Sequence, residues 1–505
     1  MNNIRAWIGL IGLSLMASIA FLDFTIVYTS LPAIQVGLNV PVIKLQLIMS
    51  VFGLAVASFM IFTGKLADQF GKRKIFFIGS FIFAIAALGA GFSTNFDMLI
   101  FFRFVQGFSV AIIFTSSSLL APLSFKEEQQ PLAISIYTGI TGLGLASGPF
   151  FGGLIVNSFG WQWIFFINVP IVLLGFILCL GNVKETKKQP HIKHDIPGLI
   201  LFVAGLSLLI FFLSYGNTLG WASISVISGL SIAVFLLLSL IFVEKRQPSP
   251  LLDINDISNP KVLLAIFICL SASVMTGILM LFIPLYLSSV LAYSSLVIGF
   301  FMLATPIMQV IVSVLWAKLS KYLGIGTIVI AAIIACLMSS LIMSFFTLQT
   351  SALLVITALG LMGIIWGVTN AACITLATTA IPEERASGVM GLIFTSWNVG
   401  ACVLIALSSV IFSQVEFSNL QTSIQKYHLQ LNVEDHHKIT AVLAAPEKAL
   451  AILKELSPEA LSHELFPLFK QSFLSGFHAV MYFASFLLLL CLLACIKIIR
   501  KYKIE

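Results

Sequence analysis

The sequence predicts an all-α polytopic membrane protein, and three observations support this fold class. Of its 505 residues, 59% are hydrophobic and only 9% are charged, and the mean hydropathy is +1.08. A soluble domain carries roughly 25% charged residues, so this composition excludes an ordinary water-facing surface. The apolar residues fall into segments of bilayer length, and the basic residues gather in alternate loops. The net charge of +7 follows from those loops and gives no reason to invoke nucleic acid.

The predicted spans number fourteen, because a helix needs about 20 apolar residues to cross the hydrocarbon core. They are expected near 6–31, 42–63, 75–94, 98–123, 131–156, 161–182, 196–216, 222–243, 261–289, 295–317, 323–347, 352–380, 386–412 and 475–498. The first resembles a secretory signal, with Arg5 before an apolar run and a cleavage-like Ser18-Ile19-Ala20. The run continues past that point and further spans follow, so we interpret it as a membrane helix.

The orientation follows from the loops. With a cytoplasmic N-terminus, the loops on that side hold 20 of the 27 Lys and Arg residues. The short outer loops hold Lys44 alone, and five more lie in one long outer loop that would translocate whatever its charge. The sequence therefore predicts that both termini are cytoplasmic, in the plasma or bacterial inner membrane.

Two charged residues lie deep within the predicted spans of the first half. Asp23 belongs to the first helix and Arg103 to the fourth, each about two turns from the outer end. Charged residues inside a span are costly and usually face an interior where they act. No other acidic side chain lies deep in a span, so if protons pass through a titrating carboxylate, Asp23 is the candidate carrier and Arg103 its candidate partner. The alternative is a structural aspartate satisfied by backbone or hydroxyl donors.

The fifth predicted helix carries the run GITGLGLASGPFFGG from Gly139 to Gly153. Gly144, Gly148 and Gly152 recur every four residues, so they line one face where another backbone can approach closely. Pro149 removes a backbone donor and can bend the helix just past that contact. The pattern indicates a packed hinge against another helix; a tightly packed helix without a special role is the alternative.

Several motifs resemble those of the major facilitator superfamily. GKLADQFGKRK (64–74) resembles its helix 2–3 loop motif, RFVQG (103–107) its helix 4 motif, and GLASGPFFGG (144–153) the helix 5 motif of its antiporters. FLDFTIVYTSLPAI (21–34) and WQWIFFINVPI (161–171) look like motifs of the fourteen-helix drug:proton antiporter branch. Departures occur at Gln69, Tyr28 and Gln162, and WAKLSKYLG (316–324) lacks the acidic residue of the loop motif.

The resemblance implies two six-helix bundles with an inserted helix pair. The expected boundaries are 1–184, 185–260 for the linkers and inserted pair, and 261–505 with an outer loop at 413–474. It also implies that Asp68 closes the inner side by reaching the start of helix 13, near Arg385. The implied gating and antiporter residues are Gly64, Asp68, Gly71, Lys72, Arg73 and Arg385, and Gly144, Gly148, Pro149, Gly152 and Gly153.

The second half has no charged residue deep in a span. Its polar and aromatic residues are typical of helix packing, yet a cavity for greasy ligands would use the same adaptable side chains. The candidate cavity residues are Tyr28, Gln106, Gln309, Trp366, Asn370, Trp397 and Asn398.

The 413–474 segment is predicted as two short amphipathic helices on the outer face, with starts at Pro446 and at Ser457-Pro458-Glu459. His436-His437 could indicate a metal, but a solvated loop is the favoured interpretation. The seven cysteines lie in apolar segments without metal-ligand spacing, so no metal or disulfide framework is predicted.

The predicted function is a proton-coupled antiporter that exports lipophilic or cationic drug-like compounds by alternating access. No phosphate-cradling GKS/T sequence or catalytic constellation occurs, so we expect no enzyme activity and no cofactor beyond the proton gradient. The alternatives are an exporter of a specific metabolite, lipid or siderophore, and a membrane receptor or scaffold. The expected partners are a small lipophilic substrate, protons and the lipid bilayer, with a periplasmic adaptor protein if the cell is Gram-negative.

Overall fold

The structure, a computed structural model, describes residues 3–38, 42–186, 195–247, 250, 254–293, 295–426 and 459–502. These residues form helices and contain no strand. The helices are α1 (Asn3–Leu38), α2 (Val42–Phe70), α3 (Lys72–Gly91), α4 (Phe96–Leu123), η1 (Glu127–Gln129), α5 (Gln130–Phe159), α6 (Trp163–Phe166), α7 (Asn168–Cys179), α8 (Ile196–Leu219), α9 (Ile224–Glu244), α10 (Ile254–Ser258), α11 (Pro260–Gly277), the π-helix η2 (Ile278–Phe282), α12 (Ile283–Ser289), α13 (Ser295–Met302), α14 (Ala304–Leu323), α15 (Ile325–Met343), α16 (Ala352–Ala380), η3 (Glu383–Arg385), α17 (Ala386–Lys426) and α20 (Glu459–Tyr502).

The helix starts follow from local capping chemistry. The side chain of Asn95 accepts a hydrogen bond from the Met98 N–H at 2.8 Å and begins α4, and Asp195, Ser223 and Ser351 cap α8, α9 and α16 in the same way. Each cap satisfies a backbone donor that the first turn leaves without an intrahelical partner. Because these caps lie at the loop ends of apolar segments, they fix where each span begins.

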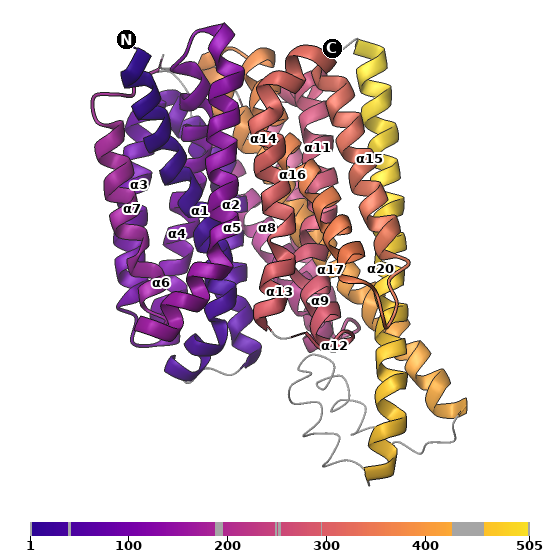
Figure 1. Ribbon diagram of the computed structural model, residues 1–505. Coiled ribbons are helices and arrows are strands. Elements are labelled where there is room, and N and C mark those ends of the chain that lie inside the picture. Colours follow the sequence, from indigo (N-terminus) through magenta and orange to yellow (C-terminus); the bar gives the residue numbers. More distant parts are fainter. Residues whose placement is uncertain are drawn as a thin grey trace.

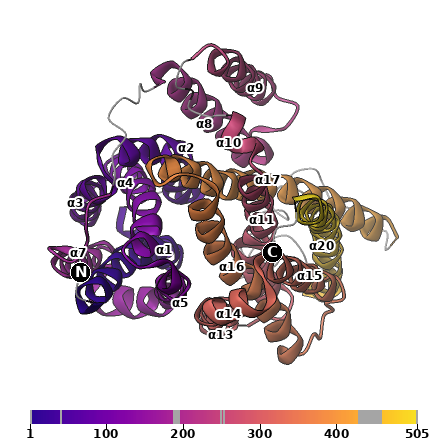
Figure 2. The same cartoon turned by 90° about the horizontal axis from the view of Figure 1, so that it is seen from above.

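Two helical bundles lie side by side (Figures 1 and 2). In the first, α1 packs on α5 and α7, and α4 packs on α2 and α3. In the second, α11, α14 and α15 pack on α16, and α17 packs on α20. The start of α1 and the end of α20 lie at the same face of the molecule (Figure 1), which we call the terminal face. The bundles meet mainly through α2 against α17 and α5 against α14.

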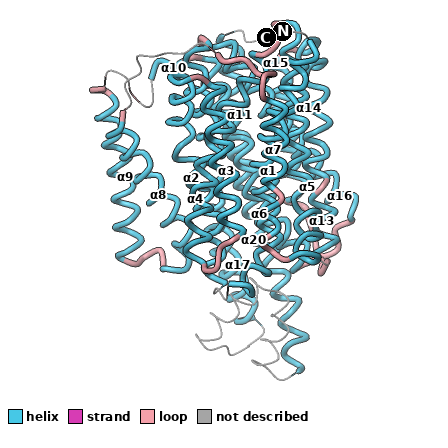
Figure 3. Tube along the Cα trace, turned by 90° about the vertical axis from the view of Figure 1, so that its left-hand side faces the viewer, coloured by secondary structure: helices cyan, strands magenta, loops and turns pink. Residues whose placement is uncertain are grey.

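The α8–α9 pair stands outside the bundles but touches both (Figures 2 and 3). Its apolar residues Phe202, Leu206 and Leu240 are buried with Ala57 of α2 and pack on Leu392 of α17. The pair therefore contacts α2 and α17, one of the two helix pairs through which the bundles meet.

Twelve helices among the described residues are long and apolar enough to cross a membrane, and α5 is a thirteenth if its bent halves form one span. The remaining predicted span, 161–182, is occupied by α6 and α7, an apolar stretch from Trp163 to Cys179 that is shorter than the roughly 20 residues of a full crossing. The count of fourteen therefore stays a prediction.

The prediction for 413–474 is confirmed at one helix start but wrong about helix length. α17 continues without a break past the predicted span end at 412 to Lys426. α20 begins at Glu459, where Ser457-Pro458-Glu459 predicts a helix start, but it runs on into the last span instead of ending as a short helix. The sequence has no Gly or Pro between Gly400 and Lys426 that would end α17. At 1.5 Å per residue its 41 residues extend about 60 Å, twice the thickness of the hydrocarbon core. The predicted helix start at Pro446 and His436-His437 lie outside the described residues.

Candidate functional site

The two charged residues predicted to pair inside the spans do so. Asp23 of α1 and Arg103 of α4 form an ion pair between Arg103 Nη1 and Asp23 Oδ2, and both side chains are completely buried. Buried charges require a partner and further hydrogen bonds, because desolvation of each ion is costly. The two helices therefore bring together one group that can take up a proton and one that stays charged at any physiological pH.

Two other helices, α7 and α2, and Gln106 of α4 complete this Asp23 site. Asn168, the first residue of α7, donates from Nδ2 to Asp23 Oδ1 at 3.0 Å, and Gln106 accepts from Arg103 Nη1 at 3.1 Å. Arg103 Nε donates to the Ile48 carbonyl of α2 at 3.3 Å, and its guanidinium lies 4.2 Å from the centre of the Phe52 ring. Among the described residues, Arg103 Nη2 and Asn168 Oδ1 have no hydrogen-bond partner. The site thus retains one buried donor and one buried acceptor without a partner among the described residues.

The predicted close contact of the glycine face of α5 is with α1. A Cβ added at Gly144 would lie 2.4 Å from the Ser18 carbonyl oxygen, and one added at Gly148 would lie 1.8 Å from Thr25 Oγ1. Any side chain at either position would force the two helices apart. Gly152 is buried, whereas nothing lies within 4 Å of a Cβ at Gly153, so Gly153 is not part of this packed face.

The predicted bend of α5 is also present. The parts Glu127–Leu145 and Phe150–Phe159 meet at 45°, and the residues between them include Gly148 and Pro149. A proline inside a helix lacks the N–H that would bond four residues back, which is an established cause of such bends.

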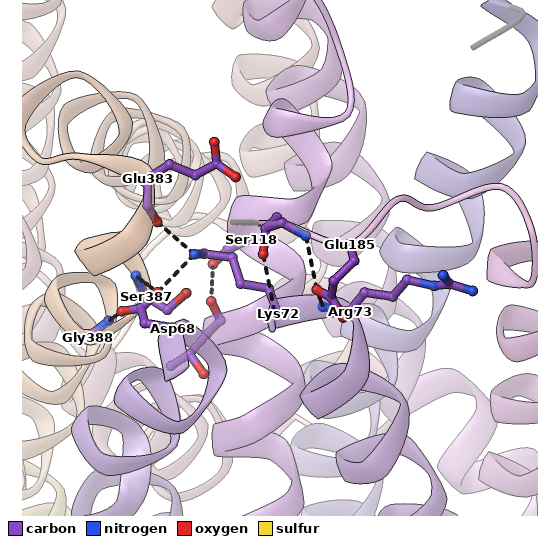
Figure 4. A network of polar contacts seen from close by, with 10 residues as sticks. Asp68, Lys72, Arg73, Ser118, Glu185, Glu383, Ser387 and Gly388 are labelled. Atoms are coloured by element: carbon purple, nitrogen blue, oxygen red, sulfur yellow. Dashed lines mark hydrogen bonds and ion pairs between the residues drawn. The ribbon is translucent and has the colours of Figure 1, made fainter. Parts of the chain in front are cut away.

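A second polar cluster joins the bundles at the terminal face (Figure 4). The carboxylate of Asp68, at the end of α2, accepts hydrogen bonds from the backbone N–H groups of Ser387 at 3.1 Å and Gly388 at 2.9 Å. These are orphan donors at the start of α17, where the helix dipole favours a negative charge. Lys72 pairs with Asp68 at 2.9 Å and donates to the Glu383 carbonyl at 2.7 Å. This Asp68 cluster ties α2 and α3 to the start of α17.

Two glycines permit the Asp68 cluster. A Cβ at Gly64 would lie 2.2 Å from the Ser387 carbonyl oxygen, so only glycine lets α2 approach α17 this closely. Gly71 has a φ of 101°, a conformation that other residues rarely adopt, between α2 and α3. The carboxylate of Glu185 then accepts from the N–H groups of Arg73 and Lys74, each at 3.0 Å, and caps α3. The sequence places Glu185 in the linker before the inserted helix pair and gives no signal of this role.

The residues that Asp68 contacts at the second bundle differ from the expected Arg385. Asp68 does reach the start of the thirteenth predicted span, which is α17, but it binds backbone N–H groups there. Arg385 Nη2 instead donates to both carboxylate oxygens of Asp256 of α10, at 2.8 and 2.9 Å. The guanidinium points to the linker helix because α10 lies immediately before α11 and presents a carboxylate at that face.

The candidate cavity residues fall in several places. Gln106 belongs to the Asp23 site, and the side chain of Tyr28 lies outside the described residues. Trp366 and Trp397 have ring centres 6.2 Å apart, and Asn398 contacts the Met60 sulfur of the first bundle at 3.7 Å. Asn370 donates weakly to the Trp366 carbonyl.

Gln309 of α14 lies where the second bundle faces the first, and Trp366 lies on the neighbouring helix α16. The amide of Gln309 lies beside Gly142 of α5, 3.3 Å from where a Cβ would stand. Gln309 Oε1 and Trp366 Nε1 are buried and have no hydrogen-bond partner among the described residues. An acceptor and a donor of this kind can bind the polar groups of a ligand.

Together, the paired bundles, the apolar spans and the buried charges define an integral membrane protein of the transporter class. The sequence model of the Major Facilitator Superfamily matches residues 13–404, and the chain belongs to that superfamily.

Individual relatives agree with this assignment. The chain is 29% identical over 408 residues to the multidrug resistance protein Stp of Mycobacterium tuberculosis, covering 80% of this chain and 76% of Stp. It is 25% identical over 412 residues to the riboflavin transporter RibZ of Clostridioides difficile, covering 81% and 89% of the two chains. The crystal structure of the human organic anion transporter MFSD10 is similar in fold, with a TM-score of 0.61, 13% identity and coverage of 96% and 99%.

Proposed function

We propose that this transporter is a proton-coupled antiporter that exports lipophilic and cationic compounds by alternating access, with the terminal face on the cytoplasmic side of the plasma or inner membrane. The observation that carries the proposal is the fully buried Asp23–Arg103 pair, which places a titratable carboxylate inside the spans. The similarity to the multidrug resistance protein Stp supports the substrate class.

The proposed energetics are sufficient for export. One charge that crosses 100 mV gains about 2.3 kcal/mol, which corresponds to roughly a fifty-fold concentration ratio for each proton. Asp23 would bind the proton from outside and release it when the terminal face opens. The same carboxylate would attract a cationic substrate, so proton and substrate would compete for one site.

The test is transport by the purified protein in liposomes, with ethidium as the probe for lipophilic cations. We expect an inward proton gradient to drive ethidium out of the compartment that faces the terminal side, and ethidium binding to release protons from the protein in detergent. Riboflavin is the second probe, because RibZ is named as a riboflavin transporter. Gradient-driven movement of riboflavin without movement of ethidium would favour the metabolite exporter; movement of neither probe would count against proton-coupled export of this class.

Asp68→Asn is expected to open the terminal face. An amide has one acceptor oxygen, so one of the two N–H groups of α17 would face an NH₂ group, and the charge that favours the helix N-terminus would be lost. Hydrogen bonds to charged groups contribute about 1.5–3 kcal/mol each, enough to shift a closed–open equilibrium by roughly tenfold or more.

Labelling measures this opening. Cysteines placed on the faces between the bundles should react faster from the terminal side in Asp68→Asn than in the parent protein. Arg385→Gln is the matched control, since it removes the pair with Asp256 and keeps the Asp68 hydrogen bonds. Equal labelling of the Asp68→Asn variant and the parent would show that these contacts do not hold the terminal face closed.

A further inference from the structure

The bend of α5 leaves a particular carbonyl without its helical donor. In an α-helix the C=O of residue i bonds to the N–H of residue i+4, so the Leu145 carbonyl would normally bond to residue 149. Residue 149 is proline, which has no N–H. A buried carbonyl without a donor in a membrane interior costs free energy, so another group is expected to supply one.

Thr25 of α1 supplies this donor. Its Oγ1 lies 3.2 Å from the Leu145 carbonyl oxygen and is buried between the two helices. The hydroxyl reaches this point because residue 148 has no side chain: a Cβ there would stand 1.8 Å from Thr25 Oγ1. Gly148, Pro149 and Thr25 thus fit one arrangement, in which proline frees a carbonyl and glycine admits the hydroxyl that binds it.

The hydroxyl has a second set of acceptors in its own helix. Thr25 Oγ1 lies 3.1 Å from the Phe21 carbonyl and 3.2 Å from the Leu22 carbonyl. A hydroxyl has one proton to donate, so a bond to Leu145 and a bond within α1 compete. A small shift of α1 against α5 would exchange one bond for the other.

Thr25 also stands close to the charged site along α1. It is two residues from Asp23 and, because successive helical residues are 100° apart, it faces a different side of the helix. Asp23 faces Arg103 of α4, the amide of Asn168 of α7 and Gln106 of α4. Arg103 is the charged group in that set, and α5 contains no Asp, Glu, Lys, Arg or His. A change of charge at Asp23 alters the forces on α1 on one side, and Thr25 meets the bend of α5 on the other.

We infer that Thr25 is the positioning residue that couples the charge state of Asp23 to the bend of α5, through a hydroxyl that exchanges between the Leu145 carbonyl and its own helix. This inference rests on the proposed function, because it gives a role to protonation of Asp23. It assigns to Thr25 no direct contact with substrate. In the cycle, loading of Asp23 weakens its hold on Arg103, α1 shifts, and the Thr25 bond to Leu145 is made or broken.

The decisive readout needs no substrate. Spin labels at Leu132→Cys on α5 and Tyr322→Cys on α14 report the separation of the two bundles at the terminal face, and both positions are exposed, at 46% and 73%. In a background without the seven native cysteines, the distribution of distances between the two spin labels is measured by pulsed electron paramagnetic resonance between pH 5 and pH 9. The parent distribution is expected to change with pH, and Asp23→Asn should remove that change.

Thr25→Val keeps the shape of the side chain and removes the donor, and Thr25→Ser restores the hydroxyl. We expect Thr25→Val to flatten the pH response while an infrared difference spectrum still shows the carboxyl band of Asp23 titrating. Ethidium transport should fall roughly tenfold, the scale of one net hydrogen bond, and Thr25→Ser should stay within about twofold of the parent. Thr138→Val is the matched control, because the Thr138 hydroxyl of α5 is buried and bonds within its own helix.

Pro149→Ala provides a second, independent arm. Alanine at this position restores an N–H that can bond to the Leu145 carbonyl, so the loss caused by Thr25→Val should be smaller in the Pro149→Ala background. An unchanged pH response in Thr25→Val, or additive effects of the two substitutions, would overturn the inference. A parent protein that responds to pH but moves neither ethidium nor riboflavin would instead count against the proposed function. The inference on Thr25 would then be decided by the spin-label distances alone.

Discussion

Asp23→Asn is expected to abolish gradient-driven export of ethidium. An amide cannot take up and release a proton at any physiological pH, so the cycle would lose the one carboxylate that lies at the centre of the buried charged network. The amide oxygen can still accept a hydrogen bond from Arg103, and Asn168 and Gln106 remain in place. The variant should therefore fold, reach the membrane and bind substrate without driving it uphill.

Two measurements separate coupling from folding. In liposomes, Asp23→Asn should show no uphill transport, and its affinity for a lipophilic cation should no longer change with pH. Asp97→Asn is the matched control, since Asp97 is an exposed carboxylate in the first turn of α4. If removal of the carboxylate leaves Arg103 uncompensated and lowers the yield, the double variant Asp23→Asn/Arg103→Gln should restore folding but not transport. Uphill transport at the parent rate would eliminate Asp23 as the proton carrier.

The sequence predicts the Asp23–Arg103 pair because both residues are exceptional in their surroundings. A carboxylate and a guanidinium inside apolar spans are each too costly to be accidental, and their distance from the span ends places them at one depth. The bend of α5 is predictable for a similar reason. Gly148 and Pro149 act directly on the backbone, and their effects do not depend on the rest of the fold.

Partners that are set by tertiary packing could not be predicted in this way. Asn168 stood within a recognised motif and is polar in an apolar span, which was a usable signal, but the sequence does not say which helix it faces. The family resemblance implies that Asp68 reaches the start of the thirteenth span, near Arg385. In the structure Arg385 donates to Asp256, and Asp68 accepts hydrogen bonds from backbone N–H groups, which every helix start possesses.

Thr25 shows the same limit more sharply. Hydroxyl residues are common in membrane helices and usually bond to a carbonyl of their own helix, as Ser14 and Thr138 do here. Thr25 lies within the 21–34 motif, but the motif does not indicate that its hydroxyl bonds to a carbonyl of another helix. Its difference arises from a residue 120 positions away, since the Leu145 carbonyl lacks a helical donor only because residue 149 is proline.

Gly148→Leu is expected to abolish transport while the protein still inserts. Even a Cβ at this position would overlap Thr25 Oγ1, so a leucine must push α5 away from α1 at the bend. The rest of the α1–α5 contact, including Gly144 against Ser18, can still hold the bundle together. Separation of the helices would break the Thr25–Leu145 bond and remove the mechanical link between the Asp23 site and α5.

The control for this prediction is Gly153→Leu in the same helix. No atom lies within 4 Å of a Cβ at Gly153, so the larger side chain meets open space and transport should continue. Both variants should show the same amount of protein in the membrane and the same melting temperature within a few degrees, the change that about 1 kcal/mol produces in a protein of moderate size. Normal ethidium transport by Gly148→Leu at normal expression would mean that the glycine face of α5 serves packing alone, because the helices would then have separated without consequence for the cycle.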